Sequence, residues 1–108
     1  MTAMTPSEFE SLAEAMLERI ARAVEESGAD CDCAPKAAGV LELEFADGNR
    51  IIVNRHSAAQ EIWVAAKSGG YHFRFDGSKW VDTRDKRELL AALSEVITGQ
   101  SGRTVTLR

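Results

Sequence analysis

Long apolar runs and cysteines placed for a disulfide are both missing from this sequence of 108 residues. No apolar run approaches the roughly 20 residues that a membrane-spanning helix needs, so we expect no membrane partner. The N-terminus has neither a basic stretch followed by an apolar one nor an Arg- and Ser-rich composition, so we expect no secretory signal and no transit peptide. Cys31 and Cys33 lie too close together to staple the chain, which is typical of a reducing compartment. These absences predict a cytoplasmic protein.

Signatures of catalysis are missing as well. His56 and His72 have no serine or cysteine nucleophile motif beside them. The sequence contains neither a phosphate-binding glycine loop nor an H-E-x-x-H pair, and Gly69-Gly70 is typical of a turn. We therefore assign no catalytic residues.

The composition is ordinary for one folded domain. The chain is 44% hydrophobic and 28% charged, with only two prolines, and its length leaves no room for a second core. It contains no internal repeats and no low-complexity stretch. The sequence therefore predicts a single domain over residues 1–108.

Charge is distributed unevenly along the chain. Residues 1–47 carry 11 acidic and 3 basic side chains, a charge of −8, whereas residues 48–108 carry 6 acidic and 10 basic ones, a charge of +4. An end polarised in this way favours cations or a basic protein as its partner. It disfavours nucleic acid, so we expect no nucleic-acid partner.

The N-terminal quarter predicts a long helix. Thr5-Pro6-Ser7-Glu8 combines a capping Thr, a Pro at the first helical position and a Glu three residues after the cap. Apolar residues recur at helical spacing from Phe9 to Val24. We expect this helix to continue to about residue 26 and to end at Ser27-Gly28.

A second helix is expected near the C-terminus. Asp85-Lys86-Arg87-Glu88 has the pattern of another capping box. Apolar residues follow at helical spacing from Leu89 to Ile97, and Gly99 is expected to end the helix.

The middle of the chain predicts an antiparallel meander, with short turns between strands at residues 40–45, 51–53, 60–67, 71–75 and 79–82. Residues 28–38 are expected to form a loop, and residues 104–107 either a short last strand or a packed tail. The order of elements predicts an α+β fold, a two-layer αβ sandwich. The N- and C-terminal helices would pack on one face of a five- to six-stranded antiparallel sheet, and the other face would meet water or a partner.

Carboxylates crowd the end of the first predicted helix and the segment after it. Glu14 and Glu18 are four residues apart and repel by about 0.2–0.5 kcal/mol, and two more glutamates occupy the last turn, where the helix dipole favours cations. We call the whole set the acidic ridge: Glu14, Glu18, Glu25, Glu26, Asp30 and Asp32. Local rules broken in a cluster tend to mark function, so we interpret the ridge as a binding site for a hard cation such as iron, manganese, magnesium or calcium.

The expected mode of binding follows from the ligand types. Because no histidine lies in this stretch, binding should be weak, multiple and sensitive to salt. The interpretation requires that the carboxylates are open to water and not neutralised by basic side chains of the same chain. The alternative is a solvated helix face that serves only solubility, and Arg19 and Arg22 favour it.

The two cysteines could clip a soft metal between them. A closed zinc site needs four ligands, however, and no cysteine other than Cys31 and Cys33 is present. We therefore interpret them as ordinary loop cysteines.

One predicted strand places a tryptophan on the open face of the sheet. Ile62 and Val64 are the natural core pair, so Trp63 points outward, where tryptophan is a favoured contact residue for a partner. Trp80 is expected to pack in the core. We expect a polar-aromatic binding face made of Asn54, His56, Glu61, Trp63, His72 and Arg74. The alternative is an ordinary solvent face with one stray tryptophan.

These residues resemble the frataxin family, and its bacterial CyaY-type branch most closely. The resemblance runs from about Ser7 to Arg108 and is carried by Val53-Asn54-Arg55, Ile62-Trp63-Val64, Ser68-Gly69-Gly70-Tyr71-His72-Phe73 and Trp80 before a Leu-rich helix. The chain also departs from the family pattern at several positions: Ala21, Arg22 and Ser27 interrupt the ridge, His56 and Glu61 stand where Gln is frequent, and Cys31 is an extra cysteine.

The resemblance implies an iron-binding accessory or regulatory protein of iron–sulfur cluster assembly. It implies weak binding of Fe2+ or Fe3+ by the acidic ridge, with other divalent cations as substitutes. It also implies contacts with the cysteine desulfurase and the iron–sulfur scaffold protein. The partner-binding residues carried over are Glu18, Glu25, Glu26, Asn54 and Trp63. We expect a monomer, with iron-dependent oligomers left open.

Two alternatives to this function stay open. One is a ferroxidase or iron-storage activity, although the chain has no buried di-iron motif of the Glu-x-x-His type. The other is a protein-interaction module that works without metal.

Overall fold

The first helix begins and ends where its capping residues dictate. The computed structural model describes residues 4–108, and helix α1 spans Pro6–Ser27. The hydroxyl of Thr5 accepts a hydrogen bond from the backbone N–H of Glu8, and the Glu8 carboxylate accepts one from the backbone N–H of Thr5. Gly28, at φ 74°, ends the helix in the left-handed conformation that glycine adopts without strain. The predicted helix and its capping box are therefore confirmed.

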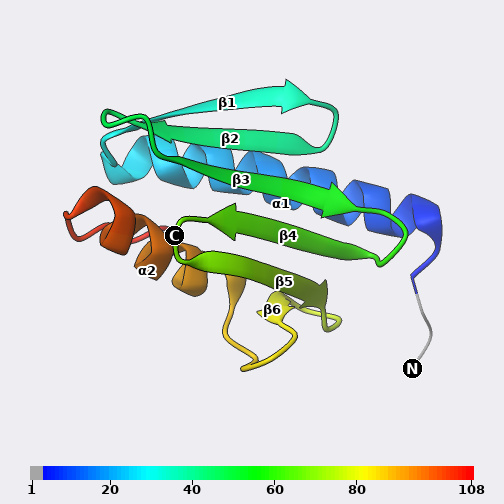
Figure 1. Cartoon of the computed structure of the whole chain (residues 1–108). Coiled ribbons are helices and arrows are strands. Elements are labelled where there is room, and N and C mark those ends of the chain that lie inside the picture. Colours follow the sequence, from blue (N-terminus) through cyan, green and yellow to red (C-terminus); the bar gives the residue numbers. More distant parts are fainter. Residues whose placement is uncertain (1–3) are drawn as a thin grey trace.

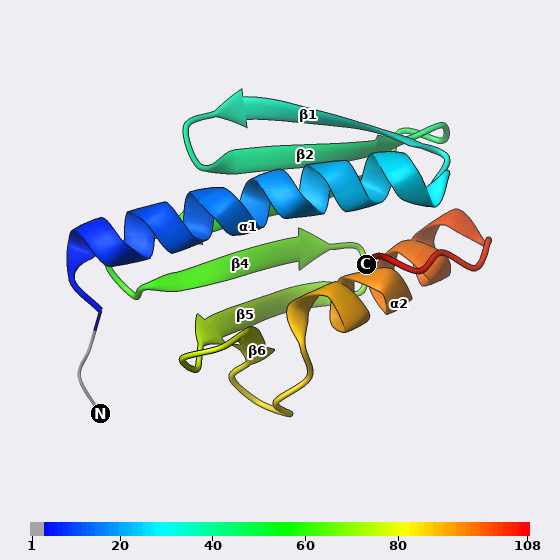
Figure 2. The ribbon, with the colours of Figure 1, turned by 180° about the vertical axis from the view of Figure 1, so that it is seen from behind.

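Six strands follow α1 in a simple antiparallel meander, each strand paired with the next along the chain. They are β1 (Cys31–Ala37), β2 (Val40–Phe45), β3 (Arg50–His56), β4 (Glu61–Ala66), β5 (Gly69–Phe75) and β6 (Trp80–Asp82), and helix α2 (Leu89–Ser101) closes the fold. Figure 1 views the open face of the sheet, with both helices behind it, and Figure 2 shows the helices from the other side. The predicted α+β two-layer sandwich, with six strands, is confirmed.

Strand β1 corrects the prediction of a loop over residues 28–38. The segment pairs with β2 at the edge of the sheet, Cys31 opposite Phe45 and Cys33 opposite Leu43. Proline suggested a loop, but an edge strand tolerates Pro35 because one side of the strand needs no ladder hydrogen bonds. The register shifts at a bulge between Pro35 and Ala37, which explains why the alternation is hard to see in the sequence.

The structure differs from the prediction at both ends of α2. It begins at Leu89, because the Glu88 carboxylate accepts hydrogen bonds from the backbone N–H groups of Leu90 and Ala91 at 2.8 and 3.2 Å. Asp85 does not start a capping box: its carboxylate binds Arg87 instead. A glycine inside a helix costs only about 1 kcal/mol, so the helix continues past residue 99 and ends at Gly102, at φ 76°.

One core lies between the helices and the inner face of the sheet. Its fully buried side chains include Phe9, Ile20, Leu43, Phe73 and Leu93. Trp80 is buried, as predicted, and its ring forms a T-shaped pair with the Phe9 ring. Residues 104–107 pack as a tail that buries Val105 and Leu107. Neither described helix is long and apolar enough to cross a membrane.

Candidate functional site

Two strand registers bring the predicted polar-aromatic face together. Asn54 on β3 lies opposite Trp63 on β4, and Trp63 lies opposite His72 on β5. In the next row, Glu61 has His56 on one side and Arg74 on the other. We call these six residues the sheet-face cluster: Asn54, His56, Glu61, Trp63, His72 and Arg74. They occupy neighbouring positions on β3, β4 and β5 that alternate with buried residues such as Val53, Ile62 and Phe73, so they lie on the face that the helices leave uncovered. Figure 1 views this face.

The centre of the sheet-face cluster is a stack of three rings. The imidazole of His56 lies 3.8 Å from the Trp63 ring, centroid to centroid, with the two planes 9° apart. The imidazole of His72 lies against Trp63 at 4.5 Å and 11°. Because β3 and β5 flank β4, the two imidazoles cover opposite faces of the indole. Trp63 is therefore half-buried and held between two side chains of its own chain.

Glu61 is buried although it belongs to the open face of the sheet, since only 6% of it is exposed. Its carboxylate accepts a hydrogen bond from Trp63 Nε1 at 2.7 Å and another from Arg74 Nη2 at 2.6 Å. His72 Nδ1 lies 3.7 Å from the same carboxylate. Burial opposes ionisation, but the hydrogen bonds from Trp63 and Arg74 outweigh it and lower the pKa of Glu61. Glu61 is thus an ionised carboxylate that connects the indole edge to a guanidinium.

The acidic ridge is only partly neutralised within the chain. Glu14 is ion-paired with Arg55, whose Nε also lies 2.9 Å from a Glu10 carboxylate oxygen. The expectation that every ridge carboxylate is unneutralised is therefore wrong for Glu14. We did not predict this pair from the sequence, although Glu10 and Glu14 are four residues apart on α1. Arg55 also lies on the same side of β3 as the buried Ile51 and Val53.

The other five ridge residues are exposed and take part in no ion pair recorded within residues 4–108: Glu18, Glu25, Glu26, Asp30 and Asp32. Arg19 and Arg22 also form none within the same range. The ridge thus offers unpaired carboxylates in water.

The ridge residues do not all lie on one surface. Asp32 is opposite Glu44 in the sheet, on strand positions that alternate with the core-facing cysteines. It therefore faces the open side of the sheet, whereas α1 lies on the other side. In the described part of the chain, no group of three or more His, Cys, Asp or Glu side chains is arranged to hold a metal ion. Any cation on the ridge would meet separate carboxylates, not a preformed cage.

The two cysteines are strand residues, not loop residues, and both are free thiols. They are half-buried against the core on the helix side of β1. Burial, assisted by the neighbouring Cys31 and Glu25, raises the pKa of Cys33 to about 11. Burial also raises the pKa of Cys31, with Asp32 and Asp30 adding to the effect. Both thiols are therefore protonated at neutral pH, which makes them poor nucleophiles.

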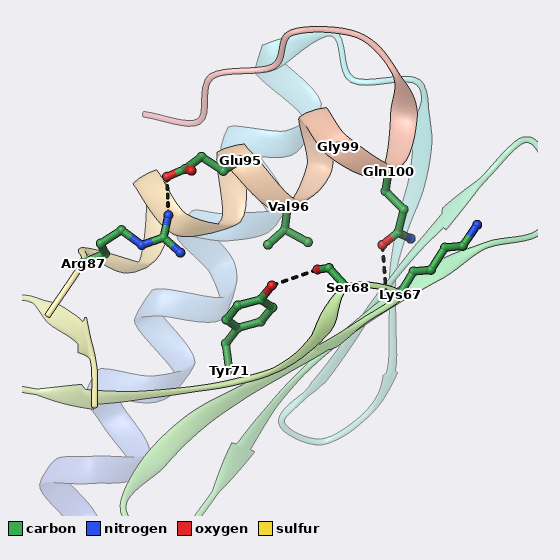
Figure 3. A pocket seen from close by; sticks show the side chains of 8 residues that line it. All are labelled: Lys67, Ser68, Tyr71, Arg87, Glu95, Val96, Gly99 and Gln100. Carbon is green, nitrogen blue, oxygen red and sulfur yellow. Dashed lines mark hydrogen bonds and ion pairs between the residues drawn. The ribbon is translucent and has the colours of Figure 1, made fainter. Parts of the chain in front are cut away.

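An open pocket of about 370 Å³ lies between α2 and the turn from β4 to β5 (Figure 3). Its polar walls are already engaged with each other: Ser68 and Tyr71 share a hydrogen bond of 2.8 Å, and Gln100 accepts one from the backbone N–H of Lys67. Arg87 is bound by Asp85 and Glu95. Most polar groups that line the pocket are thus bound by the protein itself, and no sequence pattern indicated the pocket.

The architecture defines a class of small αβ sandwiches with one uncovered antiparallel face. Residues 2–103 match the family model of the frataxin-like domain. The chain therefore belongs to the frataxin family, and the predicted resemblance is confirmed.

Relatives in bacteria match over the full length. The chain is 54% identical to the iron-sulfur cluster assembly protein CyaY of Dechloromonas aromatica, over 97% of this chain and 100% of that one. It is 50% identical to the protein of the same name from Cupriavidus metallidurans, over 100% of both chains.

Solved structures share the fold. Frataxin from Psychromonas ingrahamii has a TM-score of 0.87 at 37% identity, covering 95% of this chain and 97% of that one. Trimeric frataxin of the yeast Saccharomyces cerevisiae, complexed with ferrous iron, has a TM-score of 0.65 at 20% identity, covering 95% and 91%. At that identity, the yeast protein supports the fold alone.

Proposed function

We propose that this protein is an iron-binding regulator of iron–sulfur cluster assembly, acting in the cytoplasm as a monomer. The names of its bacterial relatives support the pathway. In this proposal the acidic ridge binds iron weakly and docks on a basic surface of the cysteine desulfurase. Asn54 and Trp63 contact the scaffold protein from the sheet-face cluster.

The observation that carries the proposal is the set of exposed, unpaired carboxylates at the C-terminal end of α1. Glu25 and Glu26 occupy the last helical turn, which contains no basic residue. The negative end of the helix dipole adds to their charge, so the local potential attracts cations and basic surfaces. A hard cation such as Fe2+ prefers oxygen ligands of this kind.

The ridge residues would not contribute equally. Glu14 is held by Arg55, so a cation would have to compete with a guanidinium for it. Asp32 faces the other side of the sheet. We therefore assign the main role to Glu18, Glu25, Glu26 and Asp30.

The two proposed contacts lie on opposite sides of the molecule. Helix α1 covers one face of the sheet (Figures 1 and 2). Trp63 stands on the other face, because it alternates with the buried Ile62 and Val64 on β4. A desulfurase on the α1 side would leave the sheet face free for a scaffold protein. This arrangement allows both partners to bind at once.

Charge reversal tests the ridge. We expect Glu25→Lys/Glu26→Lys to weaken binding of Fe2+ and of the desulfurase, measured by calorimetry under anaerobic conditions, and wild-type affinity for the desulfurase to fall as salt rises.

The matched control is Asp85→Lys/Glu95→Lys, which makes the same change in net charge beside α2 and removes two exposed ion pairs and one exposed hydrogen bond from the backbone N–H of Arg87. The control should bind nearly as the wild type. Equal losses in both variants would mean that net charge alone matters. Unchanged binding in Glu25→Lys/Glu26→Lys would mean that the ridge is a solvated face. The wild type could bind no iron while Glu25→Lys/Glu26→Lys still loses desulfurase binding. That result would favour a protein-interaction module that works without metal.

A further inference from the structure

The indole of Trp63 is fixed on three sides by its own chain. The two imidazoles of the stack cover its faces at 3.8 and 4.5 Å, and Glu61 takes its only hydrogen-bond donor. A tryptophan on a flat, open sheet would otherwise sample several rotamers. Only the outer edge of the ring is left for a partner.

The Glu61 carboxylate holds the indole in this arrangement through its hydrogen bond with Trp63 Nε1. Among residues 4–108, only Glu61 and Asp82 are charged and buried. The Asp82 carboxylate binds the backbone N–H groups of Arg84 and Asp85, which shapes the chain before α2. Within the same residues, the Glu61 carboxylate has no recorded hydrogen bond from a backbone group. Its hydrogen-bond partners are the side chains of Trp63 and Arg74, so it organises a surface and not a turn.

We propose that Glu61 is a positioning residue for Trp63, and that the stack of His56, Trp63 and His72 is a preorganised docking element. This inference rests on the proposed scaffold contact and names how that contact is made. Ordering a free side chain on binding costs affinity, and Glu61 removes that cost before the partner arrives. Because both faces of the indole are occupied, the partner meets the ring at its edge and does not stack an aromatic side chain on it.

A double-mutant cycle tests the positioning role. Glu61→Leu removes the acceptor for the indole, whereas Glu61→Gln keeps an oxygen for it and loses the charge. We expect Glu61→Leu to weaken binding of the purified scaffold protein by about 3- to 10-fold and Glu61→Gln to weaken it less. In a Trp63→Ala background, Glu61→Leu should have no further effect, because Glu61 acts through the indole.

The free protein provides a second readout that needs no partner. The indole N–H resonance of Trp63 should shift in Glu61→Leu, while that of Trp80, which lies in the core, stays in place and serves as the reference. Circular dichroism checks that the variants fold.

Three outcomes are decisive. An unmoved Trp63 resonance would overturn the positioning role, as would an equal loss of affinity in the Trp63→Ala background. If Trp63→Ala alone leaves scaffold binding unchanged, the proposed scaffold contact fails, and the indole resonance then decides the positioning role by itself.

Discussion

Arg55 shows how a single side chain determines which carboxylates are available. It leaves the inner side of β3 and binds Glu10 and Glu14 on α1, so it ties the helix to the sheet. Partly exposed pairs of this kind contribute about 0–1 kcal/mol each to stability. The same contact withdraws Glu14 from cation binding. The free carboxylates therefore begin one turn later, at Glu18.

The thiol of Cys33 gives a prediction at the same scale. Because burial raises its pKa to about 11, the thiolate is scarce at pH 7.5, and we expect slow alkylation by iodoacetamide that speeds up as the pH approaches 11. The unfolded thiol ionises near pH 9, so the free energy of unfolding should be insensitive to this group below pH 9 and should fall between about pH 9 and 11.

Mass spectrometry of alkylated peptides and denaturant titrations at several pH values measure both effects. Cys33→Ser is the control, and it should reduce the fall in stability by the part that Cys33 contributes, leaving the part due to Cys31, whose pKa is also raised. Rapid alkylation of folded protein at neutral pH would contradict the burial of this thiol.

At the scale of elements, α1 carries a conflict between stability and charge. Its last turn contains no basic residue, although the helix dipole favours cations there. We expect Glu25→Lys/Glu26→Lys to raise the free energy of unfolding by about 0.3–1 kcal/mol per residue, measured by urea titration. The variant that loses ligand binding would then be more stable than the wild type, which separates loss of function from loss of fold. A large destabilisation would mean that these carboxylates support the fold.

Local signals predicted the elements well where one rule acted alone. The capping box of Thr5 and Glu8 fixed the start of α1, and alternation around Trp63 fixed its outward direction. Strand β1 was missed because Pro35 and the bulge beside it hide the alternation. The start of α2 was misplaced because Asp85 and Glu88 both fit a cap in the sequence, whereas in the structure Asp85 binds Arg87 and Glu88 caps the helix.

The candidate site was predictable in its residues but not in its contacts. Composition and the helix dipole indicated the ridge, and strand alternation indicated the outward tryptophan. The pairing of Glu14 with Arg55 joins residues 41 positions apart, so no local pattern reveals it. The burial of Glu61 depends on the register of three strands, which decides that Trp63, His72 and Arg74 meet around it.

At the scale of the whole molecule, the two layers separate two kinds of surface. The α1 side ends in unpaired carboxylates, and the open side of the sheet carries a rigid aromatic stack with Arg74 beside it. The first surface acts through long-range charge and should be weakened by salt, whereas the second acts through shape and depends less on salt. A regulator that contacts the desulfurase and the scaffold protein at once requires such a separation.

The central claim is that the free carboxylates at the end of α1 are the cation site. The most direct measurement is an anaerobic titration of ¹⁵N-labelled protein with Fe2+, followed by the backbone amide signals. We expect that signals of residues 18–30 broaden or shift first, that those of Asn54, Trp63 and His72 stay unchanged, and that Glu25→Lys/Glu26→Lys abolishes the effect. Signals that do not respond, or a response centred on the sheet-face cluster, would contradict the claim.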